Sequence, residues 1–261
     1  MDTLLPLWPL VFGPLLIAAL TVPLIKRLAW RYNLVDHPET SAHKSHQQPT
    51  PYGGAIAIAC GVFLTLGIAL PYGLPPLRQW AIEGNIFWLV DLVRVATHFV
   101  HQGADLSLLL LGGLALFLLG LADDWRGLPP LPRFLAQLLV IVAVVGALPT
   151  CRLALFPQAP YLNMGLTVLW IGAMTNAFNF LDNMDGLSAG IAAIALIFLA
   201  FMAFLVRDFA LATFCLALFG AVCGFLLYNL PPATIFMGDA GGLFLGFSVS
   251  AVAVILSQAY A

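Results

Sequence analysis

Eight long apolar runs follow one another along this 261-residue chain, and they constrain its fold more than any other feature. An α-helix needs about 20 apolar residues to cross a bilayer, with about 17 as the lower limit. The runs that reach or approach this length are Leu4–Ile25, Gly54–Leu70, Leu106–Ala122, Phe134–Leu148, Gly165–Leu181, Leu187–Val206, Phe209–Tyr228 and Gly241–Ala259. Because hydrocarbon offers no partner to free backbone groups, spanning segments of this kind form helices. The sequence predicts an all-α polytopic membrane protein, a bundle of about eight transmembrane helices.

The composition agrees with this fold class. Hydrophobic residues make up 62% of the chain and charged residues 8%, whereas soluble domains carry about 25% charged residues. The net charge of −2 and the scattered Lys and Arg residues do not favour nucleic-acid binding. Since no linker or low-complexity tract divides the chain, we expect a single integral-membrane domain over residues 1–261.

Four polar segments, which we call the polar islands, separate the apolar runs. They are Asp36–Gly54, Asp123–Arg133, Asn176–Gly186 and Asn229–Gly242, and they follow spans one, three, five and seven. A chain that crosses the bilayer alternately therefore places all four at one face. Six Lys and Arg residues fall on that side and four on the other, which favours a cytoplasmic location for the island loops. The charged stretch Ile86–Val100 is predicted to be an amphipathic helix at the opposite face or a re-entrant segment.

Five carboxylates lie at the ends of apolar helices, where charge is costly and is kept mainly for function. They are Asp123, Asp124, Asp182, Asp185 and Asp239. The adjacent pair Asp123 and Asp124 can hold a divalent cation, steer a cationic group or accept a proton. The alternative for this pair is an ordinary solvated helix end.

The third island is dense in amides. If the preceding helix continues, Asn176, Asn179 and Asn183 stand at i, i+3 and i+7 and share one face with Asp182. Because an amide both donates and accepts hydrogen bonds, this face suits recognition of a base or a sugar.

The fourth island places Asp239 directly before Ala240, Gly241 and Gly242, at the start of the last span. Free N–H groups at a helix N-terminus predict a phosphate site there. Asp239 caps this helix, presents a carboxylate to Mg²⁺, or does both. Phe236 either stacks on a base or anchors the loop at the interface.

The first island contains Lys44 and His46, together with His43, before a Pro/Gly turn. Cationic donors in this position suit a diphosphate substrate. An ordinary cytoplasmic loop explains the same residues.

Together the islands resemble a known enzyme family. The matching strings are LADDWRGL at 121–128, NAFNFLDNMDGLSAG at 176–190 and PPATIFMGDAGG at 231–242, with a looser D-x-P…H-K-x-H…P-T-P-x-G-G match from Asp36. They resemble the polyprenyl-phosphate N-acetylhexosamine-1-phosphate transferases, glycosyl transferase family 4, and more its N-acetylglucosamine-type branch than the peptidoglycan translocase.

The resemblance implies an enzyme that transfers N-acetylhexosamine-1-phosphate from a UDP-sugar to polyprenyl (undecaprenyl) phosphate and releases UMP. The cofactor would be Mg²⁺, with Mn²⁺ as an alternative. The product would start a lipid-linked cell-envelope glycan, such as a lipopolysaccharide or teichoic-acid precursor. The protein would be a multi-pass protein of the bacterial inner membrane with its catalytic loops in the cytoplasm, and a homodimer stays open.

The resemblance also implies roles for individual residues. Asp123, Asp124, Asp182 and Asp185 would be catalytic, Lys44, His46, Asn176, Asn179, Asn229 and Phe236 would bind substrate, and Asp239 would bind the metal. Within this set, Asn229 and Phe236 would contact the uracil. Asn183 departs from the family by replacing the glycine of D-G-x-D-G. The family continues for two or three further spans with a His-rich loop, and we expect this domain to lack them.

Other functions compatible with the sequence are a catalytically inactive membrane scaffold or lipid-binding homologue and an ion transporter. The expected absence of the His-rich loop favours the first. A transporter holds its carboxylates near the middle of the membrane, whereas the acidic residues here lie at helix ends. UMP release from a UDP-sugar distinguishes an enzyme from both.

Overall fold

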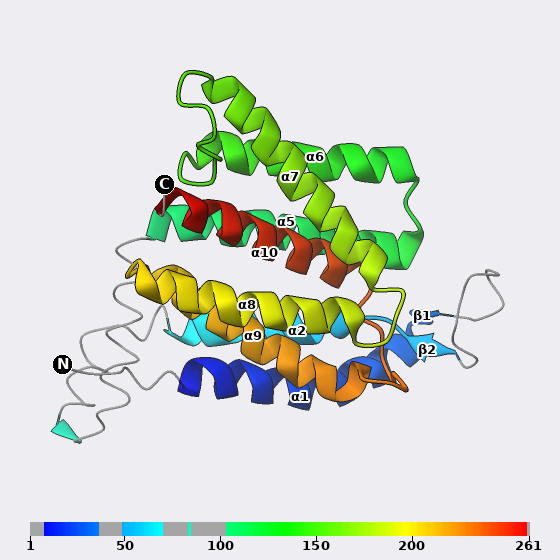
Figure 1. The fold of residues 1–261 in the computed structure, drawn as a ribbon. Helices are drawn as coiled ribbons and strands as arrows, with labels where there is room; N and C mark the ends of the chain where they lie inside the picture. The colour runs from blue at the N-terminus through cyan, green and yellow to red at the C-terminus, as the bar shows by residue number, and fades with distance from the viewer. Residues whose placement is uncertain (1–7, 37–48, 70–82, 85–102, 260–261) are drawn as a thin grey trace.

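The computed structural model describes residues 8–36, 49–69, 83–84 and 103–259, and eight helices fill most of these ranges (Figure 1). They are α1 (Trp8–Arg31), α2 (Gly54–Ala69), α5 (Gly103–Arg126), α6 (Pro130–Ala147), α7 (Pro160–Leu181), α8 (Leu187–Leu205), α9 (Phe209–Asn229) and α10 (Asp239–Ala259). Each predicted span corresponds to one of these helices, so the predicted all-α bundle is confirmed. Seven of them are long and apolar enough to cross a membrane, and α2, with 16 residues, is shorter.

Two helices begin four or more residues earlier than the apolar runs predicted. α6 begins at Pro130 rather than Phe134, and α7 begins at Pro160 rather than Gly165. Proline fits the first helical turn because the N–H group that it lacks has no partner within the helix there. The earlier start of α6 places Arg133 in its first turn.

Helices α9 and α10 form the buried centre of the bundle. In the most apolar 18-residue stretch of each span, 78% of the residues are buried in α9 and 83% in α10, against 22–39% in the other spans. α9 lies mainly against α1, α8 and α2, while α10 lies mainly against α5 and α7. The start of α10 is therefore surrounded by other helices.

Two glycine pairs, each spaced four residues apart, bring these central helices into backbone contact with their neighbours. Gly220 and Gly224 place α9 against the backbone of α1, and Gly242 and Gly246 place α10 against α7. A Cβ added at Gly242 would lie 2.7 Å from the Cα of Asn179. Small residues at this spacing allow close helix packing in membranes. The first turns of α10 therefore touch the polar end of α7.

The turns that follow α1, α5, α7 and α9 all lie at one end of the bundle, on the right of Figure 1. At this end strand β1 (Val35–Asp36) pairs antiparallel with strand β2 (Thr50–Pro51). The arrangement agrees with the prediction that the polar islands share one end. Lys44, His46 and the predicted amphipathic segment Ile86–Val100 lie outside the described residues.

Candidate active site

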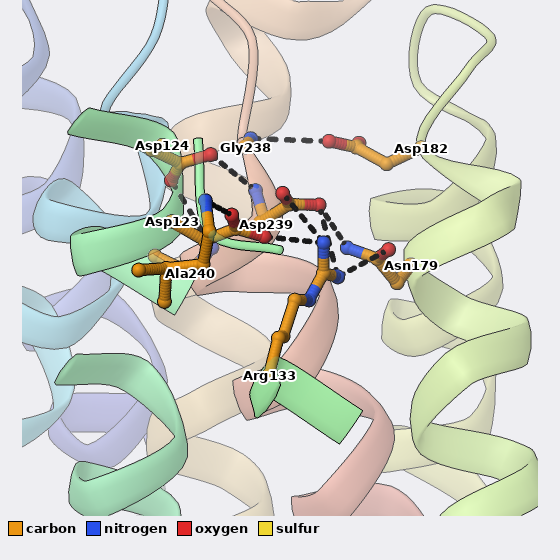
Figure 2. A network of polar contacts seen from close by, with 9 residues as sticks. Asp123, Asp124, Arg133, Asn179, Asp182, Gly238, Asp239 and Ala240 are labelled. Atoms are coloured by element: carbon orange, nitrogen blue, oxygen red, sulfur yellow. Dashed lines mark hydrogen bonds and ion pairs between the residues drawn. The ribbon is translucent and has the colours of Figure 1, made fainter. Parts of the chain in front are cut away.

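Two carboxylates, one in α5 and one directly after α7, bind the start of α10 (Figure 2). The backbone N–H groups of Asp239 and Ala240 donate to Oδ1 and Oδ2 of Asp124, at 2.8 and 3.1 Å. The N–H of Gly238 donates to Oδ2 of Asp182 at 3.1 Å. Negative charge is favourable at this end of a helix, and each of these bonds satisfies a group that the helix itself cannot.

This arrangement corrects the prediction of a free phosphate site at the start of α10. The N–H groups of Gly241 and Gly242 donate to the carbonyl oxygen of Gly238, at 3.0 and 3.1 Å. With Asp124 and Asp182 holding the three preceding N–H groups, the first turn of α10 has no N–H group left for a phosphate. The carboxylates of Asp124 and Asp182 thus accept the hydrogen bonds that were expected to bind a phosphate.

Gly238 is the residue that lets Asp124 approach so closely. Its φ is +83°, a backbone conformation that residues with a Cβ rarely adopt. A Cβ at this position would also lie 2.6 Å from Oδ2 of Asp124. The Gly-Asp pair of the fourth island is therefore required by geometry, because the glycine makes room for the carboxylate that fixes Asp239.

Arg133 of α6 is the centre of a second group of contacts (Figure 2). Its Nη1 lies 3.1 Å from Oδ2 of Asp239 and forms an ion pair with Asp123. Its Nη2 donates to Oδ1 of Asn179 at 2.9 Å. Nδ2 of Asn179 in turn donates to Oδ1 of Asp239 at 2.5 Å. We call Asp123, Arg133, Asn179 and Asp239 the Arg133 cluster.

The sequence prediction missed Arg133 and counted it only as one of the basic residues on the island side. The position of Arg133 in the sequence could have indicated that it has an acidic partner. A cation in the first turn of a helix is unfavourable against the helix dipole, and Arg133 lies in the first turn of a long apolar helix. An arginine in such a position predicts an acidic partner. The same polar island contains Asp123, which forms an ion pair with Arg133.

The side chains of Asp123 and Asp124 point to different neighbours. Adjacent residues of an α-helix point about 100° apart, because 3.6 residues make one turn. Asp123 faces α6, where its Oδ1 also accepts the N–H of Leu128 at 2.6 Å. Asp124 faces α10. One residue therefore belongs to the Arg133 cluster, and its neighbour fixes the helix that carries Asp239.

The predicted amide face of the third island is only partly correct. α7 ends at Leu181, so Asn183 lies beyond the helix, is exposed, and donates to the carbonyl oxygen of Phe180 at 2.6 Å. Asn176 donates to the carbonyl oxygen of Gly172 in its own helix, at 2.8 Å. Asn179 alone of the three joins the Arg133 cluster.

Asp185 and Asn229 hold the loop that leads into α10. Oδ2 of Asp185 accepts the N–H of Ala233 at 2.9 Å. Asn229 is 2% exposed; its Oδ1 accepts the N–H of Gly186 and its Nδ2 donates to the carbonyl of Ile235, both at 3.0 Å. Both residues were predicted to act on substrate directly, and their contacts in the structure are with the backbone of the protein.

The carboxyl group of Asp182 titrates abnormally. Burial raises its pKa well above the usual range, the negative charges of Asp124, Asp239 and Asp185 raise the pKa further, and the Gly238 N–H opposes the shift. Charge is thus unfavourable at Asp182 unless a cation lies nearby.

Phe236, three residues before Asp239, lies beside Tyr52. The two ring centroids are 6.2 Å apart and the rings are tilted by 53°. The loop here pairs with β2, since the N–H of Phe236 donates to the carbonyl of Pro51 at 2.9 Å. The hydroxyl of Tyr52 hydrogen-bonds to Asp36, and burial, followed by the charge of Asp36, raises the Tyr52 pKa.

Known proteins with similar sequences point to one family. The chain is 31% identical over 250 residues, 92% of its length, to the probable undecaprenyl-phosphate N-acetylglucosaminyl 1-phosphate transferase of Bacillus subtilis (strain 168). It is 32% identical over 188 residues, 65% of its length, to the phospho-N-acetylmuramoyl-pentapeptide-transferase of Bacillus cytotoxicus, and 31% identical over 188 residues to that of Bacillus anthracis (strain A0248). The chain spans 60% of the length of the first relative and 58% of the other two.

A further match covers the helices that carry the candidate site. Residues 106–257, more than half of the chain, match glycosyl transferase family 4. This range includes every member of the Arg133 cluster and both carboxylates that bind the start of α10. The chain therefore belongs to glycosyl transferase family 4.

Proposed function

We propose that this protein transfers N-acetylhexosamine-1-phosphate from a UDP-sugar to polyprenyl phosphate and releases UMP. The observation that carries the proposal is the Arg133 cluster, which gathers two carboxylates, an amide and a guanidinium at one end of an apolar bundle. A site at this boundary is accessible both to a soluble nucleotide and to a lipid headgroup. The names of the Bacillus relatives describe transfer of this kind.

The donor set of the cluster suits Mg²⁺. Among the described residues, no three His, Cys, Asp or Glu side chains meet as a ready metal site. Mg²⁺ commonly takes only one or two protein carboxylates and fills its other positions with water and phosphate oxygens. Asp239 and Asp123 would supply these carboxylates, and the amide oxygen of Asn179 lies beside them. When bound there, the ion would neutralise negative charge on the reacting phosphates.

The residues of the site mainly handle charge and position. The second pKa of a phosphate monoester is about 6, so a lipid phosphate is mostly dianionic near neutral pH and needs little help from a general base. The guanidinium of Arg133 contributes positive charge where two anions must meet. Asp124, Asp182, Asp185 and Asn229 act as positioning residues, because they hold α10 and its preceding loop.

Several roles rest on the family resemblance. Phe236 and Asn176 are proposed to contact the nucleotide. Lys44 and His46 are proposed to contact the diphosphate. We propose the cytoplasmic face of a bacterial inner membrane as the location, because the basic residues favour the island side. A covalent aspartyl intermediate is tested by incubating the protein with UDP-sugar alone, where UMP release together with a trapped enzyme that carries N-acetylhexosamine-1-phosphate on an aspartate would exclude single displacement.

The direct test is UMP release by the full-length protein in the presence of undecaprenyl phosphate and MgCl₂, with UDP-N-acetylhexosamines as donors. Asp239→Asn keeps the size of the side chain but removes its charge, so we expect UMP release to be abolished. The matched control is Asp208→Asn at the other end of the bundle, where Oδ1 of Asp208 accepts the N–H of Leu211 at 2.9 Å. That variant should retain full activity.

Two results would contradict the proposal. Normal UMP release by Asp239→Asn would exclude the assigned metal ligand. A folded wild-type protein that binds polyprenyl phosphate but releases no UMP from any donor would support the inactive lipid-binding homologue instead.

A further inference from the structure

Gln137 is a buried amide in the interior of α6 whose polar atoms have no partner among the described residues. Its side chain is 1% exposed, and neither Oε1 nor Nε2 forms a hydrogen bond with any residue that the structure describes. Almost all buried polar groups in folded proteins have a partner, because an amide that leaves water without one is unfavourable in an apolar interior. An amide in this environment indicates a ligand that supplies the missing hydrogen bonds.

Gln137 shares the face of α6 that carries Arg133. The two residues stand at i and i+4, one helical turn or about 5.4 Å apart along the axis. Further along the same face, Ile141 and Val144 lie beside glycines of α7 and α5, so this face points into the bundle. Side chains of a helix lean toward its N-terminus. The amide of Gln137 is therefore directed toward the turn that contains Arg133.

The Arg133 cluster contains a second buried oxygen that lacks a hydrogen-bond donor. Oδ2 of Asp123 forms an ion pair with Arg133, but it accepts no hydrogen bond from the rest of the described chain. Arg133 connects the two groups, because it pairs with Asp123 and lies one turn before Gln137. Two oxygens near Arg133 can therefore each accept a hydrogen bond that the described residues do not supply.

The charges around Gln137 indicate which kind of donor is missing. Asp123 and Asp239 carry two negative charges against the one positive charge of Arg133, so a bare anion is disfavoured here and a cation is favoured. Mg²⁺ commonly binds one or two carboxylates and keeps several of its waters, which are hydrogen-bond donors. A polar group one helical turn from the carboxylates is placed to contact such a water instead of the ion itself.

We propose that Gln137 is a positioning residue whose amide oxygen accepts a hydrogen bond from a water bound to the cation at Asp123 and Asp239. This inference rests on the proposed function, which assigns Mg²⁺ to these two carboxylates. Groups that hydrogen-bond to the ligands of a metal orient those ligands, and their replacement typically lowers metal affinity or activity about 10- to 100-fold. Gln137 thereby holds the hydrated ion from the inner side of the site.

One substitution should have opposite effects on stability and on metal affinity. Gln137→Met keeps the length of the side chain and removes both polar atoms, so it takes an unpartnered amide out of an apolar interior. In EDTA we expect the melting temperature of this variant to equal or exceed that of the wild type, because the methionine loses no hydrogen bond within the protein. A glutamine that serves only the fold would give a lower melting temperature.

Metal affinity is measured without turnover. The full-length protein in detergent micelles is titrated with MnCl₂, free Mn²⁺ is followed by its EPR signal, and MgCl₂ is added as a competitor. We expect Gln137→Met to bind Mn²⁺ about tenfold more weakly than the wild type. Gln137→Glu retains an oxygen acceptor and should bind Mn²⁺ at least as tightly as the wild type. The matched control is Ile141→Met, which places the same side chain one turn further along this buried face and should leave the affinity unchanged.

The results separate this role from the proposed transfer. Unchanged Mn²⁺ affinity of Gln137→Met, a lower melting temperature of this variant in EDTA, or equally weak binding by Ile141→Met would overturn the role of Gln137 even if the protein releases UMP. Equally weak binding by Gln137→Glu would overturn the assignment of the amide oxygen, and a wild type that binds no Mn²⁺ would overturn the whole inference. Weaker binding by Gln137→Met alone, with a wild type that releases no UMP, would support the role of Gln137 and contradict the transfer.

Discussion

Arg133 contacts both Asp123 and Asp239, so one positive charge faces two negative charges at the end of the bundle. The side chains of Arg133 and Asp239 are 20% and 31% exposed, and that of Asp123 is 6% exposed. This surplus of negative charge favours the divalent cation that we propose for the site. In addition to the positive charge that we propose it contributes to the reaction, Arg133 stabilises the carboxylates when no metal is present.

Replacing Arg133 by methionine should therefore make stability depend on Mg²⁺. In EDTA we expect Arg133→Met to lose about 1–3 kcal/mol, since it leaves partly buried carboxylates without their cation. Added MgCl₂ should restore more stability to the variant than to the wild type. Thermal unfolding in both buffers measures this. Arg126→Met, which changes an exposed arginine at the same end, is the control. Equal melting temperatures of the two variants in EDTA would contradict the role of Arg133.

Asp182 should make stability depend on pH. An aspartate in an unfolded chain titrates near about 3.9, and burial raises the pKa of Asp182 well above that range. The folded protein therefore retains a proton that the unfolded chain has lost. The stability contributed by this proton is fully present below about pH 3.9 and is lost as pH rises toward the folded-state pKa.

Asp182→Asn removes this pH dependence and keeps an oxygen acceptor for the Gly238 N–H. In EDTA, we expect the variant to be more stable than the wild type at about pH 8, with a difference that shrinks toward about pH 5. Melting temperatures across this range provide the measurement. A wild-type protein that gained stability over the variant as pH rises would show that the direction of the shift is wrong.

At the scale of the elements, the contact between α5 and α10 decides where Asp239 lies. A Cβ at Gly120 would lie 2.5 Å from both N and Cα of Ala240. Four residues later Asp124 binds the N–H groups of Asp239 and Ala240. One face of α5 thus provides the close approach and then the hydrogen bonds that hold the first turn of α10.

Gly120→Ala should displace this turn. Overpacking costs about 1–3 kcal/mol, and a shift of about 1 Å in a catalytic group can cost about a hundredfold in rate. We expect Gly120→Ala to lower both the stability and the reaction rate, measured by thermal unfolding and by UMP release. Gly190→Ala is the matched helical control, because a Cβ there would meet no described atom within 4 Å. If Gly120→Ala behaved like this control, the proposed close contact would be incorrect.

At the scale of the whole molecule, every turn that contributes to the site lies at one end of the bundle (Figure 1). Arg126 and Asn183 are exposed at this end, and Tyr161, which is 88% exposed, lies at the other. The two ends should therefore face different compartments.

Cysteine labelling tests this sidedness. The four native cysteines are first replaced, and Arg126→Cys, Asn183→Cys and Tyr161→Cys are made one at a time. We expect a membrane-impermeant maleimide to label the first two from the cytoplasmic side and the third from the opposite side. Labelling of Arg126→Cys and Asn183→Cys from different compartments would contradict the bundle.

The sequence by itself determined the eight helices, their order and their common polar end. This was possible because the hydropathy of a window of about 20 residues reflects a requirement that any fold in a bilayer must meet. It also singled out Asp123, Asn179 and Asp239, which the structure brings together, since polar side chains at the ends of apolar helices are rarely kept without a role. The predicted starts of α6 and α7 were less accurate. Both helices begin at a proline, Pro130 and Pro160, which is tolerated in the first turn but does not belong to the apolar run.

Only the tertiary structure decided how these residues divide their work. It brought Arg133 to Asp239, which is 106 positions away in the chain, and separated Asp123 from its neighbour Asp124. It also closed the start of α10 with two carboxylates and used Asn229 to hold a loop. Partners of this kind depend on how far each helix is rotated and how closely it approaches the next. Packing across the bundle sets both, and no local window of sequence contains that information.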